Sequence, residues 1–445
     1  MGAAHGATVD TTTARDWFWP AVAAIAVVAA VLRVVYVVAE LWHTPLGDDA
    51  SFYYLESLLF AKGHVFIDPF QYIYTLGNNV FPTAAHPPLF TLLLTGANLL
   101  GVKSQNSAKV FCAVLGGLGV IPVAMLAREV GGRRTGIIAA GLAAIFVPRV
   151  VSDGSVFSEV LYAPLVAFFL LAMFRFLRSP SMRGGVVAGL LGGLAAMTRG
   201  EGIILVAVVG VVVLLGVAVT WWRRVVLLGV ILGTSLVVIA PWTVYNLTRF
   251  HDPVLISTNN GSVVAGANCD LTYYGARLGM WIFNCPHKGD RHLTGDDSQV
   301  EKGLRDEGLK YARRHIGRVP VVVAARIGRT FHLYRPMQSV KIDIGTGWRA
   351  TASLIAYEAL MVAAVVGGYI LWRRDRKALL PFAGATLAVI ITVATAYGNF
   401  RFRVPVDISF LVMGAVALDA LMARAGARRH VAPRDARVAP SGLAT

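Results

Sequence analysis

The sequence predicts an all-α protein that crosses a membrane many times. Of its 445 residues, 56% are hydrophobic and only 15% are charged, and the mean hydropathy is +0.62. Soluble proteins carry about 25% charged residues. Apolar runs of about 18 to 22 residues recur along the chain, and each is long enough to cross a hydrocarbon layer about 30 Å thick. These observations argue against a soluble multidomain protein.

Ten apolar runs are the predicted membrane crossings. The first of them is too long for the core of a signal peptide and has no small-residue cleavage site behind it, so we expect a retained transmembrane helix. The ten runs lie near residues 17–42, 108–128, 136–151, 157–177, 185–198, 201–220, 225–245, 350–372, 379–397 and 406–424. A further run, 87–102, is short and opens with two prolines. We expect an interfacial or re-entrant helix there, with a full crossing as the alternative.

Basic residues in the short linkers predict how these crossings are oriented. Lys and Arg collect in cytoplasmic loops, and here they cluster after every second crossing. The clusters lie at residues 128–134, 178–183, 223–224 and 373–377, with a basic tail from Arg424. Both ends are therefore expected in the cytoplasm. Such loops also explain the net charge of +16 without nucleic acid, because no soluble segment interleaves a basic face with aromatic residues.

The alternation divides the chain into seven predicted segments. They are a cytoplasmic N-terminus (1–16), a first transmembrane helix (17–42), an outer loop with interfacial helices and an acidic pair (43–107), a transmembrane bundle (108–245), an outer loop with a disulfide (246–349), C-terminal transmembrane helices (350–424) and a basic cytoplasmic tail (425–445). The outer loops are the ones rich in His, Tyr, Asn and carboxylates. We therefore expect the chemistry to face the extracytoplasmic side, where nucleotide sugars and ATP are absent. The excess of Arg over Lys and the many Ala, Val and Gly residues point to a bacterial plasma membrane.

Two of the three cysteines share the second outer loop. Cys269 and Cys285 flank a segment with turn-forming glycines, and an extracytoplasmic compartment permits a disulfide between them. Two free thiols are the alternative. Cys112 lies within a predicted membrane helix, where we expect a small packing residue.

An acidic pair follows the first predicted crossing. Asp48 and Asp49 open a stretch, 48–63, whose apolar residues recur at helical spacing, which predicts a helix on the membrane surface with Asp48 as its N-cap. Asp49, Glu56 and Lys62 are then expected to face water. One helix start needs only one capping carboxylate, and acidic residues close to a membrane are typical of functional sites. The pair is therefore a catalytic candidate, with the helix cap as the structural alternative.

Other polar residues lie at predicted outer ends of helices. His86 precedes Pro87 and Pro88, which hold it in an extended backbone where it could donate to a phosphate or hydroxyl; a polar boundary residue is the alternative. Asp153 and Glu159 lie at the mouth of a helical hairpin, and Glu159 is costly there unless it faces a cavity or a partner. At the next outer turn we expect Arg199 and Glu201 to pair with each other as a loop staple.

The element N-F-R-F-R-V-P-V-D precedes the last predicted helix. Arg401 and Arg403 would face outward, against the positive-inside trend, and their alternation with Phe places both guanidinium groups on one side of an extended segment. Such a pair suits a bidentate grip on phosphate oxygens. Contact with lipid head groups is the alternative. The sequence contains no P-loop, dinucleotide-binding glycine motif, Ser-His-Asp signature or His/Cys metal cluster with convincing spacing.

These elements, in this order, resemble the GT-C superfamily of polyprenyl-phosphate-sugar-dependent glycosyltransferases, and among them the family-39 type of the protein O-mannosyltransferases and the lipid A aminoarabinose transferase. The matching features are the acidic pair after the first helix, the Tyr-containing helix ending near Gly63, the H-P-P-L element at His86, Glu159, the T-R-G-E turn and the terminal R-F-R-V-P element. The resemblance spans residues 40–410. It implies the GT-C fold, with about 10 transmembrane helices.

The resemblance also implies a reaction. A polyprenyl-phosphate-linked sugar, mannose- or arabinose-like, would lie in the outer leaflet, and an acceptor hydroxyl would attack its anomeric carbon with inversion. Such attack needs a carboxylate base and cations near the leaving phosphate. The positions that match give Asp48 as the base, with Asp49 orienting it or contacting the acceptor. The implied phosphate-binding residues are Arg401, Arg403, His86 and, less directly, Lys109. Glu159 and Asp153 would form a second acidic site near the acceptor.

The chain departs from its relatives in ways that leave the acceptor open. It has Asp-Asp where many relatives have Asp-Glu, and it lacks the large C-terminal soluble domain and the MIR insertion of some of them. A protein, a glycolipid and a cell-envelope glycan are all acceptable partners, and a divalent metal is left open. The rival interpretation is a transporter or flippase of an anionic (glyco)lipid, against which the chain shows no internal repeat and gathers its polar groups on one side.

Overall fold

The computed structural model describes residues 17–283, 285 and 293–431, with the side chain of Asp48 and the side chains beyond residue 425 left out. The predicted N-terminus, 1–16, and the tail from residue 432 therefore lie outside the described residues. Within the described ranges the chain is all helical, and its only β-type pairing is an isolated bridge between Ile67 and Pro82. The predicted all-α class is confirmed.

The first half of the chain forms twelve α-helices. These are α1 (Phe18–Tyr36, continued by the π-helical turn η1, Val37–Leu41), α2 (Asp48–Ala61), α3 (Pro69–Tyr74), α4 (Leu89–Leu99), α5 (Gln105–Leu118), α6 (Val120–Gly131), α7 (Arg133–Ile145), α8 (Val147–Asp153), α9 (Glu159–Arg178), α10 (Met182–Thr198), α11 (Gly202–Gly216) and α12 (Trp221–Leu247). Prolines open or punctuate several of them. Pro69, for example, stands at the first position of α3, where its missing N–H costs nothing.

The second half begins with short helices and ends with long ones. They are α13 (Asn260–Ala267), α14 (Asp270–Tyr273), η2 (Gly275–Arg277), α15 (Asp297–Arg314), η5 (Ile316–Arg318), α16 (Val319–Thr330), α17 (Pro336–Asp343), α18 (Trp348–Arg374), η6 (Arg376–Leu379), α19 (Leu380–Thr395), η7 (Phe400–Arg403) and α20 (Val404–Val431). The predicted outer loop 246–349 is thus a set of helices rather than irregular chain.

Seven helical stretches are long and apolar enough to cross a membrane. They are Phe18–Leu41, Gln105–Gly131, Glu159–Arg178, Trp221–Leu247, Trp348–Arg374, Arg376–Thr395 and Phe400–Ala425. An eighth span is formed if α7 and α8, which meet at a bend of 55°, count as one. α10 and α11 coincide with predicted crossings but have only 17 and 15 residues, or about 25 and 22 Å of helix. The predicted count of ten is therefore not confirmed.

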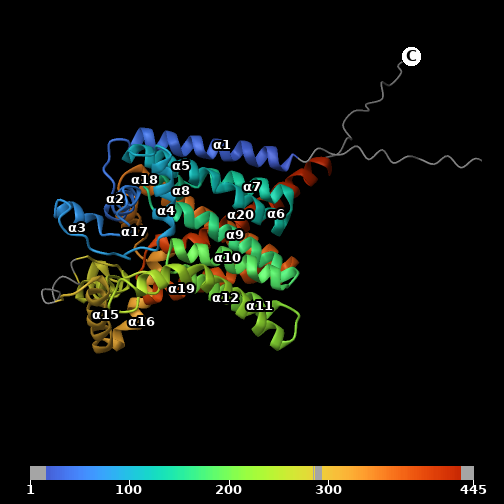
Figure 1. Ribbon diagram of the computed structural model, residues 1–445. Helices are drawn as coiled ribbons and strands as arrows, with labels where there is room; N and C mark the ends of the chain where they lie inside the picture. The colour runs from blue at the N-terminus through green and yellow to red at the C-terminus, as the bar shows by residue number, and fades with distance from the viewer. Residues whose placement is uncertain (1–16, 284, 286–292, 432–445) are drawn as a thin grey trace, which may run out of the picture.

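The long helices run side by side and the polar segments gather at one end of them. In Figure 1, α2, α3, α15 and α16 lie at one end of the bundle, whereas the start of α1 and the end of α20 lie at the other. The core of the bundle centres on α9, whose Phe169, Met173, Phe174 and Phe176 are at most 1% exposed. The predicted outer segments 43–107 and 246–349 thus meet in space, above the same end of the bundle.

The helix that carries the acidic pair differs from the prediction in two respects. Its N-cap is Gly47, with Asp48 as the first helical residue, so the expected cap position is wrong by one residue. Glu56 does not face water: it is 4% exposed and accepts a hydrogen bond of 2.5 Å from the Thr91 hydroxyl. The reason is that α4 packs against the face of α2 that carries Glu56. This face was expected to meet water and is covered instead.

Candidate active site

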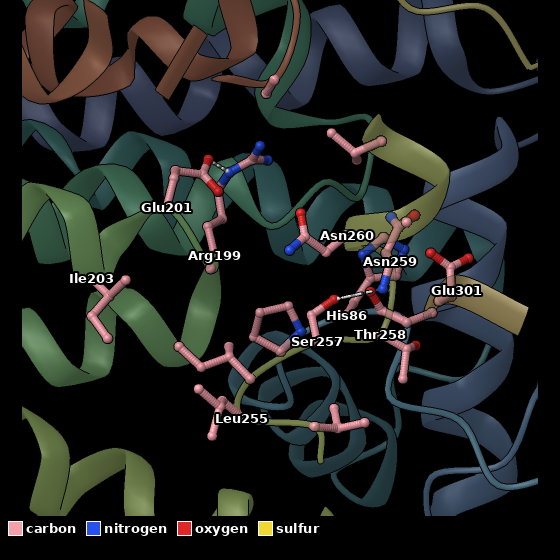
Figure 2. A pocket seen from close by; sticks show the side chains of 18 of the residues that line it. His86, Arg199, Glu201, Ile203, Leu255, Ser257, Thr258, Asn259, Asn260 and Glu301 are labelled. Carbon is pink, nitrogen blue, oxygen red and sulfur yellow. Dashed lines mark hydrogen bonds and ion pairs between the residues drawn. The ribbon is translucent and has the colours of Figure 1, made fainter. Parts of the chain in front are cut away.

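A large cavity separates the end of the bundle from the helices that cover it. Its volume is about 1070 Å³, slightly above the roughly 300–1,000 Å³ typical of small-molecule sites. Asp49 and Tyr53 of α2 and His86 line it together with the turn between α10 and α11 and the membrane-side face of α12. Figure 2 shows Arg199 and Glu201 on one side of this cavity, with His86, Asn259, Asn260 and Glu301 across from them.

A network of arginines and carboxylates runs through the cavity wall. Arg401 binds Asp49 through Nη1, at 2.8 Å from Oδ2, and binds Glu159 through Nε and Nη2. Arg199 continues the network, with Nη1 at 2.7 Å from Glu159 and Nε at 2.5 Å from Glu201. These five residues come from four distant parts of the sequence. Buried charges are stable only when paired in this way, so the network fixes the positions of its members.

Local backbone structure sets the direction of Arg401. The amide N–H of Arg401 donates to the side-chain oxygen of Asn399 at 2.8 Å, which begins the 3₁₀ turn η7. The guanidinium then lies 4.3 Å from the centre of the Phe157 ring. Ring contact on one face and two carboxylates at its edge leave little freedom for this side chain.

Asp49 is the carboxylate that the cavity exposes. Its side chain is 40% exposed, and only Oδ2 has a hydrogen-bond partner within the described residues. Burial is the largest single influence and raises the pKa of Asp49, but the charge and hydrogen bond of Arg401, together with the neighbouring His86, outweigh it and hold the pKa of Asp49 below its ordinary value. The group is therefore ionised near neutral pH, with Oδ1 open to the cavity. Such an oxygen can accept a proton.

His86 lines the cavity beside Asp49. Its ring packs against Phe52 and Tyr53, at centroid distances of 5.0 and 4.6 Å. Burial lowers the pKa of His86 below its ordinary value; Asp49 opposes this shift, whereas Arg401 and Arg199 act in the same direction as burial. The imidazole is thus neutral near pH 7, and it can offer a ligand one N–H donor but no full positive charge.

Not all predicted site residues meet here. Lys109 donates from Nζ to the carbonyl oxygens of Leu41 and Thr44, both at 2.7 Å, and so caps the end of η1. Asp153 is buried in ion pairs of 2.7 Å with Arg33 and with Arg149. Neither side chain lines the large cavity. The side chain of Asp48 lies outside the described residues.

Arg403 points away from Arg401, so the predicted shared orientation of the two guanidinium groups is wrong. Residues 400–403 form a 3₁₀ turn instead of an extended segment, and in a turn with three residues per repeat positions i and i+2 diverge. Arg403 is fully buried and donates to Asp407 at 2.7 Å and to the Thr330 carbonyl at 2.9 Å. It joins α16 to α20.

Three cavity residues were missed or underestimated from the sequence. Arg199 does pair with Glu201 as expected, but it also binds Glu159 and so belongs to the site. Tyr53 and Tyr397 line the cavity, and no feature of their spacing singled them out. The position of Tyr397 directly before the G-N-F-R-F-R element is the one signal that could have drawn attention to it. Among the described residues, no group of three or more His, Cys, Asp or Glu side chains is arranged to hold a metal ion.

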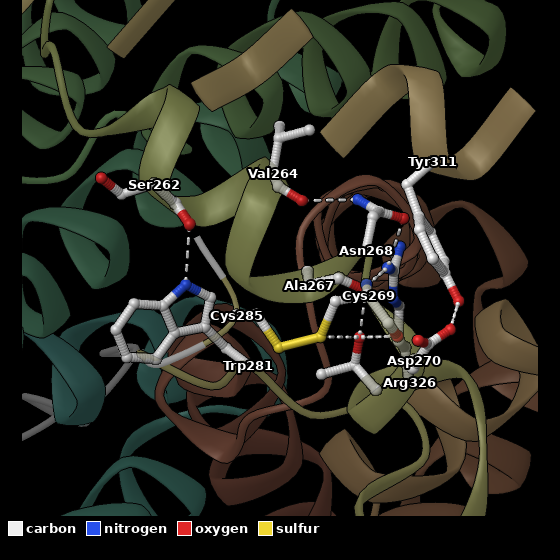
Figure 3. Close-up of a disulfide and its surroundings, with 11 residues drawn as sticks. Ser262, Val264, Ala267, Asn268, Cys269, Asp270, Trp281, Cys285, Tyr311 and Arg326 are labelled. Carbon is white, nitrogen blue, oxygen red and sulfur yellow. Dashed lines mark hydrogen bonds between the residues drawn. A yellow bond between two sulfur atoms is a disulfide. The ribbon is translucent and has the colours of Figure 1, made fainter. Parts of the chain in front are cut away.

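The outer cover of the cavity is tied together by a disulfide. Figure 3 shows the bond between Cys269 and Cys285, with Trp281 donating to the Ser262 carbonyl at 2.9 Å beside it. Arg326 of α16 donates to the Ala267 carbonyl at 2.7 Å. Segment 262–285 is thereby fixed to α16, and α13 is held over the cavity.

Comparison with known proteins agrees with this arrangement. Residues 85–245 match the family model described as dolichyl-phosphate-mannose-protein mannosyltransferase, a segment of less than half the chain that begins immediately before His86. No curated protein matches the whole sequence significantly.

Solved structures match over most of the chain. The oligosaccharyltransferase AglB of Archaeoglobus fulgidus, in complex with an inhibitory peptide and a dolichol-phosphate, has a TM-score of 0.56 at 17% identity and covers 96% of this chain and 53% of its own. The same enzyme tethered to an acceptor peptide has a TM-score of 0.58 at 16% identity, with coverages of 94% and 51%. ArnT of Cupriavidus metallidurans, bound to undecaprenyl phosphate, has a TM-score of 0.44 at 17% identity, with coverages of 94% and 80%. The chain thus spans about half the length of the archaeal enzyme.

The fold is therefore the GT-C fold. The chain is similar over residues 85–245 to dolichyl-phosphate-mannose-protein mannosyltransferases and shares its fold with the oligosaccharyltransferase AglB.

Proposed function

We propose that the protein is an inverting membrane glycosyltransferase of a bacterial plasma membrane, which moves a mannose- or arabinose-like sugar from a polyprenyl-phosphate donor to an acceptor hydroxyl on the extracytoplasmic side. The observation that carries the proposal is the position of Asp49. Its carboxylate is ionised, bound on one oxygen by Arg401 and open on the other to a cavity of about 1070 Å³. The names of the matched proteins, which include dolichyl-phosphate and undecaprenyl phosphate, support the donor class.

The walls of the cavity suit a lipid-linked sugar. Ile203 and Ile204 of α11 and Ile239 of α12 give it an apolar wall, and Leu236 and Val244 of the same wall are 55% and 60% exposed on the outside of the bundle. A polyprenyl chain can lie there without meeting a charge. The opposite wall offers Asn259, Asn260 and Glu301, whose amide and carboxylate groups match the hydroxyls of a sugar ring.

The chemistry follows from the order of groups between these walls. The acceptor hydroxyl gives its proton to Oδ1 of Asp49 while its oxygen forms a bond to the anomeric carbon. The bond from that carbon to the phosphate oxygen breaks, and the electron pair leaves with the polyprenyl phosphate. Arg401 stabilises the growing negative charge, and His86 donates one further hydrogen bond. We assign Glu159 to holding Arg401 and Arg199 in place.

Two earlier candidates for the phosphate are better placed for other work. Arg403 and Lys109 have partners away from the large cavity, so we propose that they stabilise helix ends and leave phosphate binding to Arg401 and His86. Asp48 remains a candidate for the base beside Asp49, and substitution of each residue separates them.

The test compares Asp49→Asn with Asp48→Asn in transfer from a synthetic polyprenyl-phosphate sugar to envelope material from a deletion strain. Loss of a general base lowers rates by about 10²- to 10⁴-fold. We expect Asp49→Asn to show this loss with donor affinity unchanged, Asp48→Asn to retain more activity, and Asp306→Asn, an exposed control, to behave as wild type. Full activity of Asp49→Asn would exclude it as the base. If Asp48→Asn lost more activity than Asp49→Asn, the general base would be Asp48.

A further inference from the structure

A second cavity lies behind the Arg401–Glu159 pair. Its volume is about 220 Å³, and it is enclosed by the end of α1, α8, the end of α17, the start of α18 and the first residues of α20. This is below the roughly 300–1,000 Å³ of sites for drug-sized ligands, but it exceeds several times the ~30 Å³ occupied by a water molecule. The space suits one polar head group.

Most charges around this cavity are already neutralised. Asp153 pairs with Arg33 and Arg149. Glu159 pairs with Arg199 and Arg401, and Asp407 pairs with Arg403. These residues form part of the cavity wall, and their charges are balanced without a ligand.

Three polar groups of the wall lack such partners. Arg349 has no carboxylate within ion-pair distance among the described residues, although Glu40 lies in its neighbourhood. The Tyr36 hydroxyl is buried and lies beside Arg349, with no hydrogen bond of good geometry to any described residue. Asp343 accepts a hydrogen bond of 3.0 Å from Asn399 but binds no cation. Buried polar groups without partners are rare in folded proteins and usually mark a site for a ligand or water.

Exposed apolar side chains lie beside the residues that line this cavity. Trp348, next to Arg349, is 57% exposed, and Ile342, next to Asp343, is 60% exposed. On α1, Val35 and Val38 are also more than half exposed. Tryptophan beside arginine at the end of a membrane helix is typical of the level of lipid head groups.

We infer that this second cavity binds the phosphate-containing head group of a membrane lipid, with the phosphate on Arg349 and the Tyr36 hydroxyl and the hydroxyl or ammonium donors of the head group on Asp343. The cation of Arg349 and the carboxylate of Asp343 lie in the wall of the same small cavity. Together they match a ligand that carries both an anionic group and hydrogen-bond donors. The lipid tails would lie along the exposed apolar side chains of α1 and α18.

The position of this site relative to Asp49 suggests what the lipid does. Arg401 lines both cavities and contacts Asp49, whereas Asp49 lines only the large one. A head group in the second cavity can therefore reach Arg401 but neither Asp49 nor the apolar wall proposed for the donor. The bound lipid then acts on the base through Arg401 and is not itself the acceptor, a statement that rests on the proposed function.

The experiment measures lipid binding to the full-length protein in detergent by native mass spectrometry, without any donor. The probe is dioleoyl phosphatidylglycerol, which carries a phosphate and two hydroxyls, and dioleoylglycerol and inorganic phosphate are the comparison ligands. Loss of a charged hydrogen-bond donor predicts about tenfold weaker binding or more for Arg349→Gln, and about threefold for Tyr36→Phe and Asp343→Asn. Arg349→Lys, which keeps the charge, should retain most of the affinity. Lys341→Gln removes an exposed charge from the neighbouring helix and should change nothing.

Each outcome decides a different statement. Equal binding by wild type and Arg349→Gln, or an equal loss in Lys341→Gln, would overturn the site. Inorganic phosphate binding as tightly as the lipid would overturn the lipid source. In the transfer assay, added phosphatidylglycerol should change the kcat of wild type but not that of Arg349→Gln, and an equal effect on both would overturn the link to the base alone. Because binding is measured without donor, a failed site leaves the proposed transferase intact, and inactive Asp49→Asn says nothing about the lipid.

Discussion

Glu56 is a buried acid seven residues after Asp49 on the same helix. Burial raises the pKa of Glu56 to about 8. The Thr91 hydrogen bond and the charge of Arg249 lower the pKa, but by less than burial raises it. The carboxyl is therefore protonated near pH 7 in the folded protein. In the unfolded chain it titrates near its ordinary value of about 4.3. Between these two pH values the folded protein holds a proton that the unfolded chain has lost.

This difference predicts how stability depends on pH. Because the folded state binds the extra proton, the free energy of unfolding falls as pH rises from about 4.3 to 8, by up to about 5 kcal/mol. Glu56→Gln keeps the shape and the Thr91 contact but cannot ionise. We expect its melting temperature in detergent to exceed that of wild type by a margin that grows from pH 5 to pH 8.

One control and one contradicting outcome accompany this comparison. Glu307→Gln, at an exposed position of α15, should follow the wild-type curve at every pH. Wild type and Glu56→Gln running in parallel across the range would show that Glu56 is ionised in the folded protein, against the prediction.

At the scale of elements, the backbones of α18 and α20 approach each other closely at Gly367. A Cβ atom on Gly367 would lie 1.7 Å from the Met413 carbonyl oxygen, so only glycine fits there. One residue further, a Cβ on Gly368 would meet only the flexible Met413 sulfur, at 3.4 Å. Small residues allow helices in membranes to pack closely.

These neighbouring glycines form a matched pair for mutation. Gly367→Ala must push the helices apart and should lower the stability by about 1–3 kcal/mol, the cost of overpacking. Gly368→Ala should leave the melting temperature within a degree or two of wild type. The measurement is thermal unfolding of both variants in one detergent. Equal melting temperatures would mean that α18 and α20 do not pack as described.

The local backbone structure also explains why the side chains of Arg401 and Arg403 point in different directions. Alternation of Phe and Arg is typical of an extended segment. Here, however, the Asn399 side chain accepts a hydrogen bond from the Arg401 backbone N–H and so starts a 3₁₀ turn. The local hydrogen bond competes with the extended backbone and wins. A two-residue period in so short a segment cannot distinguish the two backbones.

At the scale of the molecule, both described chain ends lie at one end of the bundle, and α2 and α15 lie at the other (Figure 1). Residues of α2 and α15 line the large cavity. The basic linkers predict that the first end is cytoplasmic. Arg305→Cys, on α15, should then react with an impermeant maleimide added to intact cells, and Arg223→Cys, at the start of α12, should react only after lysis. Both positions are exposed, Cys112 is buried and Cys269 is bonded to Cys285, so wild type should not label. Reversed labelling would invert the predicted topology.

The sequence could predict most helices because apolar runs and proline positions act locally. Each of the ten apolar runs coincides with a helix or a helix pair, and Asp49, His86, Glu159 and Arg401 were all recognised as candidates. The burial of Glu56 was not predictable, since it depends on where α4 lies. The partners of Lys109 and Asp153 likewise come from helices far away in the sequence.

The sequence alone thus determined the class of protein, the gathering of its polar residues at one end and the acidic pair as the centre of interest. Composition and charge alternation decide these features, because they reflect the transfer of whole helices into lipid. Only the tertiary structure decided which carboxylate faces the cavity, which arginine binds it and that a second cavity lies behind them. Those outcomes depend on contacts between residues as far apart as Asp49 and Arg401, and no local pattern records such contacts.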